Sequence, residues 1–89
     1  MQQLSETALC RELVKTVEEK ANLIYAELQR ACKKFPPFNS CHEGYSVILE
    51  ELDELWEEIK RNPKDMTRIE REATQVGAMA LRFLIDLCG

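Results

Sequence analysis

Apolar residues recur at steps of three and four positions along most of the chain, and the pattern breaks at two segments that contain proline. This spacing is typical of amphipathic helices, whereas half-buried strands alternate with a period of two. Each proline removes a backbone donor and restricts the residue before it. The pattern therefore predicts an all-α chain with three helices separated by these two breaks.

The first helix is predicted from about Glu6 to Lys34 and ends at the sequence Phe35-Pro36-Pro37-Phe38. One face of this helix carries its apolar positions, which is the arrangement of a helix that packs on a core. These positions are Leu9, Leu13, Val17, Ala21, Ile24, Leu28, Ala31 and Phe35.

The second helix is predicted to begin after Ser40, because Ser40 and Glu43 have the spacing of a capping box. Asn62-Pro63-Lys64-Asp65 separates it from a third helix, for which Asn62 or Asp65 is the expected N-cap. The buried side of the second helix is predicted to carry Tyr45, Ile48, Leu49, Leu52, Leu55, Trp56 and Ile59. The stripe of the third comprises Ile69, Ala73, Val76, Ala80, Phe83, Leu84 and Leu87, with small residues Ala73, Gly77 and Ala80 that permit a close helix contact.

A single domain over residues 1–89 is expected from the length and from 45% hydrophobic content. A chain of this size buries only about 60–65% of the surface that it exposes when unfolded. Three amphipathic helices also do not complete a four-helix bundle. We expect three antiparallel helices whose core is completed in a homodimer or homotetramer.

Charge and cysteine content exclude several classes of function. The net charge of −4 and a single adjacent basic pair, Lys33-Lys34, argue against binding a nucleic-acid polymer. The four cysteines have no Cys-x-x-Cys spacing, which favours reduced, partly buried thiols over a zinc site. No basic patch precedes an apolar core at the amino terminus, and no apolar run approaches the roughly 20 residues of a membrane span. We expect a cytoplasmic protein with no membrane role.

The second helix is unusual in its charge, with six acidic residues and no basic residue between positions 50 and 58. Like charges three and four residues apart oppose helix formation. Helical geometry places Glu51, Glu54 and Glu58 on one margin of the apolar face, and Glu72 on the corresponding margin of the third helix. Converging carboxylates favour a hard divalent cation such as magnesium. The alternative is an acidic margin that is simply solvated.

Two segments of these helices resemble a known family. Glu50-Glu51-Leu52-Asp53-Glu54, followed by Glu72-Ala73-Thr74-Gln75, is similar to the paired motifs of the all-α nucleoside triphosphate pyrophosphohydrolases, the MazG-like proteins. In those proteins Glu-Glu-x-x-Glu and Glu-x-x-Asp on adjacent helices bind magnesium. The likeness covers roughly residues 40 to 86.

The resemblance implies a MazG-like helical bundle that cleaves a nucleoside triphosphate into a monophosphate and pyrophosphate, with Mg²⁺ or Mn²⁺ as cofactor. It implies Glu51, Glu54 and Glu72 as metal ligands and Glu50 as a further ligand or the group that orients the attacking water. Gln75 stands where the family has aspartate. A neutral amide coordinates magnesium more weakly than a carboxylate. Either the site works with three carboxylates and an amide oxygen, or the chain keeps the fold and has lost much of its activity.

Phosphate and base contacts have candidates of their own. Lys60, Arg61, Lys64 and Arg82 are the candidate phosphate ligands, and their alternative is ion pairing, with favourable spacing for Arg68–Glu72 and Arg82–Asp86. The candidates for base recognition are Trp56, Tyr45 and His42. Core packing is the alternative for the aromatics, and plain surface exposure is the alternative for His42.

Two functions are thus expected from the sequence. The first is a magnesium-dependent nucleotide pyrophosphohydrolase, which the paired motifs favour. The second is a non-catalytic helical interaction module, which Gln75 favours.

Overall fold

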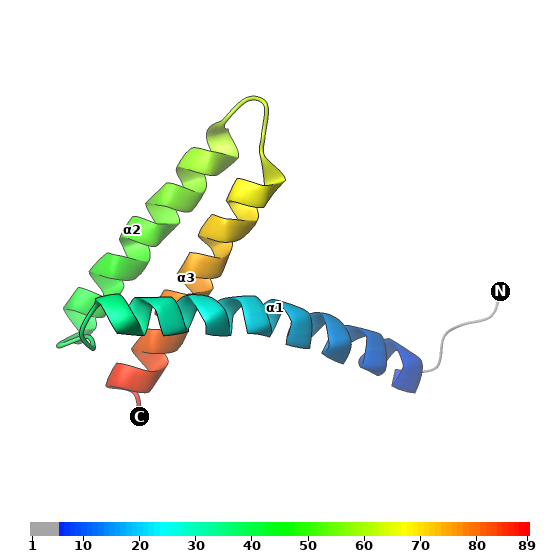
Figure 1. Ribbon diagram of the computed structural model, residues 1–89, viewed down its shortest axis with the longest axis horizontal. Helices are drawn as coiled ribbons and strands as arrows, with labels where there is room; N and C mark the ends of the chain where they lie inside the picture. Colours follow the sequence, from blue (N-terminus) through cyan, green and yellow to red (C-terminus); the bar gives the residue numbers. More distant parts are fainter. Residues whose placement is uncertain (1–5) are drawn as a thin grey trace.

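The computed structural model describes the backbone of residues 6–89 and the side chains from residue 10 onward. Within this part of the chain there are three α-helices and no strand: α1 (Glu6–Lys34), α2 (Cys41–Lys60) and α3 (Met66–Leu87) (Figure 1). The all-α prediction is confirmed, with the first helix at the expected bounds. Leu9 of the predicted stripe lies outside the residues whose side chains are described.

Local capping determines where α2 and α3 begin. The Ser40 hydroxyl accepts a hydrogen bond from the Glu43 backbone N–H at 3.1 Å, as a helix N-cap does. Asp65, rather than Asn62, caps α3 by accepting from the backbone N–H groups of Thr67 and Arg68. Both caps satisfy N–H groups that have no partner within the helix.

Only α2 and α3 run antiparallel, as a helical hairpin (Figure 1). The helix α1 crosses α3 obliquely, and its N-terminal half extends past the hairpin (Figure 1). The prediction of three antiparallel helices is therefore correct for α2 and α3 and wrong for α1. An amphipathic stripe defines which face of a helix is buried, but it leaves the crossing angle open.

A buried arginine holds the C-terminal end of α1 on α3. The Arg82 side chain, whose residue is 4% exposed, donates to the carbonyl oxygens of Ala31 at 3.3 Å and Phe35 at 2.9 Å. Its Nε donates to the Asp86 carboxylate at 3.1 Å, and this carboxylate also accepts from the Phe38 backbone N–H at 3.0 Å. We call this arrangement the Arg82 clamp. It supplies side-chain donors to two carbonyl groups where α1 ends and the regular backbone hydrogen bonds of the helix stop.

Two glycines allow close helix contacts. A Cβ atom at Gly44 of α2 would lie 2.5 Å from the Phe83 ring of α3, and one at Gly77 of α3 would lie 3.0 Å from Ile24 of α1. The close contact predicted for Gly77 is thus present, whereas Ala73 and Ala80 are exposed.

The core of the described chain is small. Its buried apolar residues are Leu28, Ala31 and Ala78. The radius of gyration is 16.2 Å, against roughly 12 Å for a compact domain of this length. About half of each predicted stripe remains open: Leu13 and Val17 of α1 are exposed, and so are Leu52 and Trp56 of α2.

The cysteines are free and exposed at all four positions, so the expected partial burial is wrong. Among the described helices, none combines the length and the apolar character needed to cross a membrane.

Candidate metal centre

Three carboxylates converge where α2 faces α3. Glu51, Glu54 and Glu72 each offer an oxygen atom, and these oxygens all lie within 4.8 Å of one another. Glu51 and Glu54 are one helical turn apart on α2, and the antiparallel hairpin brings Glu72 of α3 opposite them. The predicted convergence of these three side chains is therefore confirmed. Glu51 and Glu72 are half-buried, while Glu54 is exposed.

The cluster favours protonation of its own members. Burial, and after it the negative charges of Glu54, Glu72 and Glu27, together raise the pKa of Glu51 from 4.5 to about 7. The pKa of Glu72 is also raised, first by burial and then by the charge of Glu54. Glu27 comes from α1, so all three helices contribute negative charge here. A cation bound at this point would relieve the repulsion.

Gln75 lies between the two half-buried carboxylates. With its amide nitrogen turned toward them, it donates to Glu51 Oε2 at 2.8 Å and to Glu72 Oε2 at 3.1 Å. This orientation follows from the hydrogen-bond network, since only acceptors surround the nitrogen. Gln75 therefore reaches the position expected of a fourth ligand, and its amide links the two helices.

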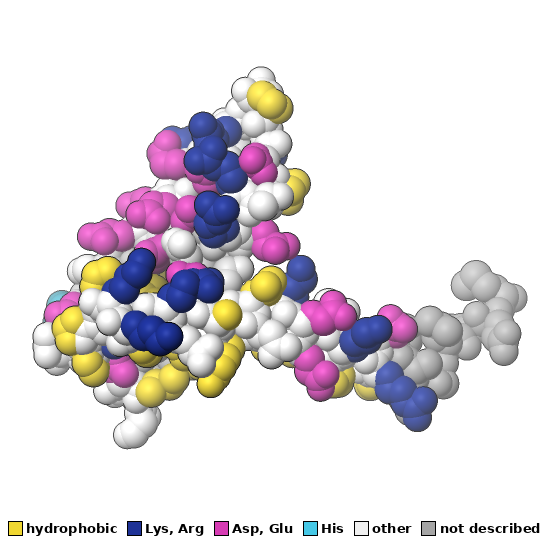
Figure 2. All heavy atoms as spheres, in the orientation of Figure 1, with side chains coloured by type: hydrophobic (Ala, Val, Ile, Leu, Met, Phe, Trp, Pro, Cys, Tyr) yellow, Lys and Arg dark blue, Asp and Glu magenta, His cyan; other side chains and the backbone are white. Residues whose placement is uncertain are grey.

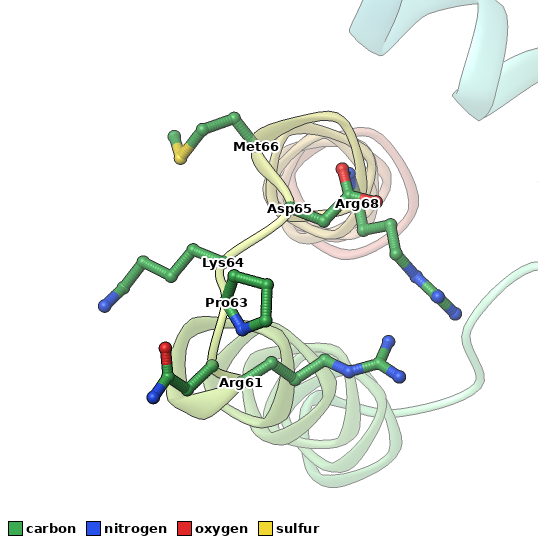
Figure 3. A pocket seen from close by; sticks show the side chains of 7 residues that line it. Arg61, Pro63, Lys64, Asp65, Met66 and Arg68 are labelled. Carbon is green, nitrogen blue, oxygen red and sulfur yellow. The ribbon is translucent and has the colours of Figure 1, made fainter.

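Basic side chains gather next to the carboxylates at the tip of the hairpin. Arg61 and Arg68 pair with Glu58 at 3.2 Å and 3.4 Å. Arg68 therefore pairs with Glu58 across the hairpin. Its spacing in the sequence had instead predicted a pair with Glu72. Figure 3 shows the Arg61 and Arg68 side chains extending to the same side of the hairpin, whereas Lys64 points the other way. The pocket at this tip has a volume of about 620 Å³. Arg68 is absent from the residues predicted to contact substrate, because its spacing suggested only an ion pair.

A separate, apolar pocket lies toward the other end of the α2–α3 hairpin, beyond the carboxylates. Val47 precedes Glu51 by one turn of α2, and Met79 follows Gln75 by one turn of α3. Together with residues of the α1–α2 connection they enclose a pocket of about 230 Å³. Its lining is Phe35, Pro36, Phe38, Glu43, Val47, Met79 and Arg82. In the sequence this segment indicates only the end of a helix. Nothing in its local pattern predicts that Phe35 and Phe38 line a pocket.

Two predicted residues have other surroundings. Glu50 is exposed and is not among the carboxylates that converge. The guanidinium of Arg82 is engaged in the clamp, as its predicted pairing with Asp86 suggested, and it forms the floor of the apolar pocket.

The aromatic and basic candidates on the outer side of α2 lie apart from the carboxylates. Trp56 is 56% exposed and about 140° around the helix from Glu51, so it is neither core nor part of the cluster. Lys60 pairs with Glu57 at 2.8 Å and lies over the Trp56 ring at 5.7 Å. Tyr45 and His42 are exposed, and His42 is on the side of α2 opposite Glu51.

Charge is therefore divided along the molecule. Figure 2 shows acidic side chains gathered over α2, between basic side chains at the hairpin tip and those on the C-terminal half of α1. No family model, no curated protein and no solved structure matches this chain. The likeness to the MazG-like proteins accordingly rests on the two sequence motifs alone.

Proposed function

We propose that this chain is a MazG-like nucleoside triphosphate pyrophosphohydrolase that depends on Mg²⁺ or Mn²⁺ and works as a homo-oligomer. The observation that carries the proposal is the convergence of Glu51, Glu54 and Glu72 within 4.8 Å, with the pKa of Glu51 raised to about 7. Three ionised carboxylates held this closely repel one another, and a bound cation would remove this repulsion.

The donor set fits a hard divalent cation. Carboxylate oxygens from two helices are the ligands that Mg²⁺ prefers, and Mg²⁺ usually retains waters and bridges to substrate phosphates. Glu51, Glu54 and Glu72 would hold the ion, with the Gln75 amide oxygen available after rotation of its side chain. When bound, the ion would neutralise the phosphate charge and polarise an attacking water.

The order of chemical character along the groove supports a nucleotide substrate. Arg61 and Arg68 stand at one end, the carboxylates in the middle and the pocket with Phe35 and Phe38 at the other. This order matches a nucleoside triphosphate whose terminal phosphates contact the arginines and whose base enters the apolar pocket. Ring faces such as those of Phe35 and Phe38 stack on bases of any sequence.

The reaction that fits this orientation is hydrolysis at the α-phosphorus. The oxygen of a water forms the new bond to that phosphorus, and the bridging bond to the β-phosphate breaks to release pyrophosphate. Arg61 and Arg68 would balance the charge that develops on the leaving group, which is how positioned cations assist phosphoryl transfer. Glu50 stays a predicted group for orienting the water.

A second function is supported by different features. The exposed apolar residues of α1 and α2, and the amide at position 75, suit a non-catalytic helical module that assembles with other chains. In this case the acidic cluster would set solubility and partner choice.

Thermal denaturation with millimolar Mg²⁺ or Mn²⁺ separates the two functions. A cation that binds only the folded chain must stabilise it by mass action, by roughly 2.7 kcal/mol at a hundred times its dissociation constant. We expect the midpoint to rise for the natural chain and to stay unchanged for Glu54→Ala. The matched control is Glu57→Ala, which removes an exposed carboxylate of the same helix and should keep the full shift.

Pyrophosphate release from a panel of canonical and modified nucleoside triphosphates then tests the chemistry. We expect Glu54→Ala and Arg68→Ala to lower the rate by roughly 100-fold or more, as loss of a charge-stabilising group does. Glu57→Ala should retain the natural rate. If metal stabilises the chain but no pyrophosphate is released, the chain is a cation-binding module and not a hydrolase. If Glu54→Ala releases pyrophosphate at the natural rate, the reaction does not take place at the carboxylate cluster.

A further inference from the structure

We infer that the open apolar surface of the hairpin is covered by a second copy of this chain, through the part of its α1 that extends past the hairpin. The inference specifies the assembly in the proposal above and does not depend on hydrolysis. Two surfaces carry it. The arm is residues 10–22 of α1, with Leu13, Val14 and Val17 exposed by 52–64%. The hairpin face consists of Tyr45, Leu49, Leu52, Trp56 and Leu84, exposed by 41–64%.

The hairpin face is one continuous surface that points away from α1. Tyr45 of α2 and Leu84 of α3 line the same shallow apolar groove, with Ile48, Ala80 and Phe83 between them. Around α3, Ala80 and Leu84 are about 160° and 120° from Ala78, which is fully buried. The α1 of the same chain therefore cannot cover this face.

The arm continues the buried face of α1. Leu13 and Val17 lie within about 60° of Leu28, which is buried where α1 meets α3. The same stripe is thus buried in its C-terminal half and bare in its N-terminal half, where α1 runs past the hairpin (Figure 1). The arm spans about 18 Å, which matches the roughly 17 Å between Tyr45 and Trp56 along α2.

The exposed apolar area is sufficient for a stable dimer. With roughly 150–250 Å² for a large apolar side chain, the arm and the hairpin face together expose on the order of 800–1,000 Å² per chain. Stable interfaces bury about 800 Å² per partner.

The distribution of charge favours packing of the arm on the hairpin face over packing of two hairpin faces on each other. Two hairpin faces packed on each other would bring together two α2 helices, each with six acidic and no basic residues between positions 50 and 58. The arm carries three basic residues, Arg11, Lys15 and Lys20, and three acidic residues, so it has no net charge. Packing the arm of each copy on the hairpin face of the other covers both surfaces and avoids the repulsion between acidic helices.

Sedimentation velocity of the full chain in EDTA tests this arrangement. We expect the natural chain to form a dimer. Leu13→Glu with Val17→Glu removes the arm contact, and Leu52→Glu with Trp56→Glu removes the contact on the hairpin face. Each double variant should weaken dimerisation by roughly 100-fold or more, because a carboxylate would be buried without a partner. The control, Gln29→Glu on α1 combined with Ser46→Glu on α2, adds the same two charges at exposed polar positions and should leave the dimer intact.

An equimolar mixture of the two double variants gives the deciding result. The intact arm of one variant can still pack on the intact hairpin face of the other, which restores one of the two contacts, so the mixture should associate more tightly than either variant alone and less tightly than the natural chain. Helical circular dichroism verifies that each variant is folded. A natural chain that stays monomeric, or a mixture that associates no more tightly than either variant alone while the natural chain dimerises, would overturn the inference.

Discussion

Glu51 shows how a single side chain can report on the candidate metal centre. Its pKa is about 7 in the folded protein, against an ordinary value of 4.5, so the folded state binds more protons than the unfolded state between these two pH values. In the absence of a cation the free energy of unfolding should therefore fall as the pH rises from 5 to 8. After allowance for solvent screening the change is about 1–2 kcal/mol. Urea denaturation in EDTA at several pH values measures it.

Two comparisons separate Glu51 from other titrating groups. In Glu51→Gln the side chain at position 51 cannot ionise, so the free energy of unfolding of this variant should vary less over this pH range. In Glu57→Gln it should vary as much as in the natural chain. Millimolar Mg²⁺ at pH 8 should restore the lost stability of the natural chain, because a cation neutralises the deprotonated cluster. Equal pH dependence of Glu51→Gln and the natural chain would contradict the assigned environment.

A substitution at Gln75 tests whether this side chain is one of the metal ligands. In Gln75→Asp a fourth carboxylate replaces the amide that donates to Glu51 and Glu72. We expect Mg²⁺ to bind roughly tenfold more tightly by calorimetry, since added ligand charge strengthens hard-cation sites. Without metal the same variant should be less stable, because a donor is lost and a repulsive charge is gained. Unchanged affinity would show that position 75 is not a ligand.

At the scale of the elements, the Arg82 clamp determines how α1 lies on α3. Arg82→Met removes the buried donor that Arg82 supplies to the carbonyls of Ala31 and Phe35 and to the Asp86 carboxylate. The Ala31 carbonyl keeps its bond from the Phe35 N–H, and Asp86 keeps its bond from the Phe38 N–H. We expect a loss of about 3–5 kcal/mol in the free energy of unfolding, as for other broken buried pairs. Urea denaturation of Arg30→Met is the control, because the exposed Arg30–Glu27 pair should contribute less than about 1 kcal/mol. Losses of equal size in the two variants would contradict the clamp.

The difference between local and long-range interactions explains which elements the sequence predicts. Ser40 and Asp65 cap helices through bonds to residues two or three positions away, so their spacing alone is informative. Glu51, Glu54 and Glu72 were predictable because one antiparallel hairpin fixes which faces meet. Arg82, by contrast, contacts carbonyls 47 and 51 residues earlier, and no local pattern indicates such partners. The pairing of Arg68 with Glu58 and the pocket beside Phe38 depend on tertiary packing in the same way.

The whole molecule is open on two opposite sides, and these sides have different character. On the side of α1, basic, acidic and apolar groups follow one another along the groove between α2 and α3. The side away from α1 is almost entirely apolar along the hairpin face. A polar groove suits a small charged ligand, and an apolar face suits another protein surface. Assembly through the hairpin face would therefore leave the candidate metal centre accessible.

If this assembly supplies part of the core, stability must depend on protein concentration. The single chain buries few apolar side chains, so dimerisation should add to the stability of a marginal folded monomer, and the dimer should dissociate as it unfolds. Dilution by about a hundredfold then costs roughly 2.7 kcal/mol per mole of dimer and should lower the thermal midpoint by several degrees. Differential scanning fluorimetry of the natural chain over this range measures the shift. Leu52→Glu with Trp56→Glu should melt at a lower temperature that does not change with concentration. A natural chain whose midpoint is independent of concentration would mean that the three helices are stable alone.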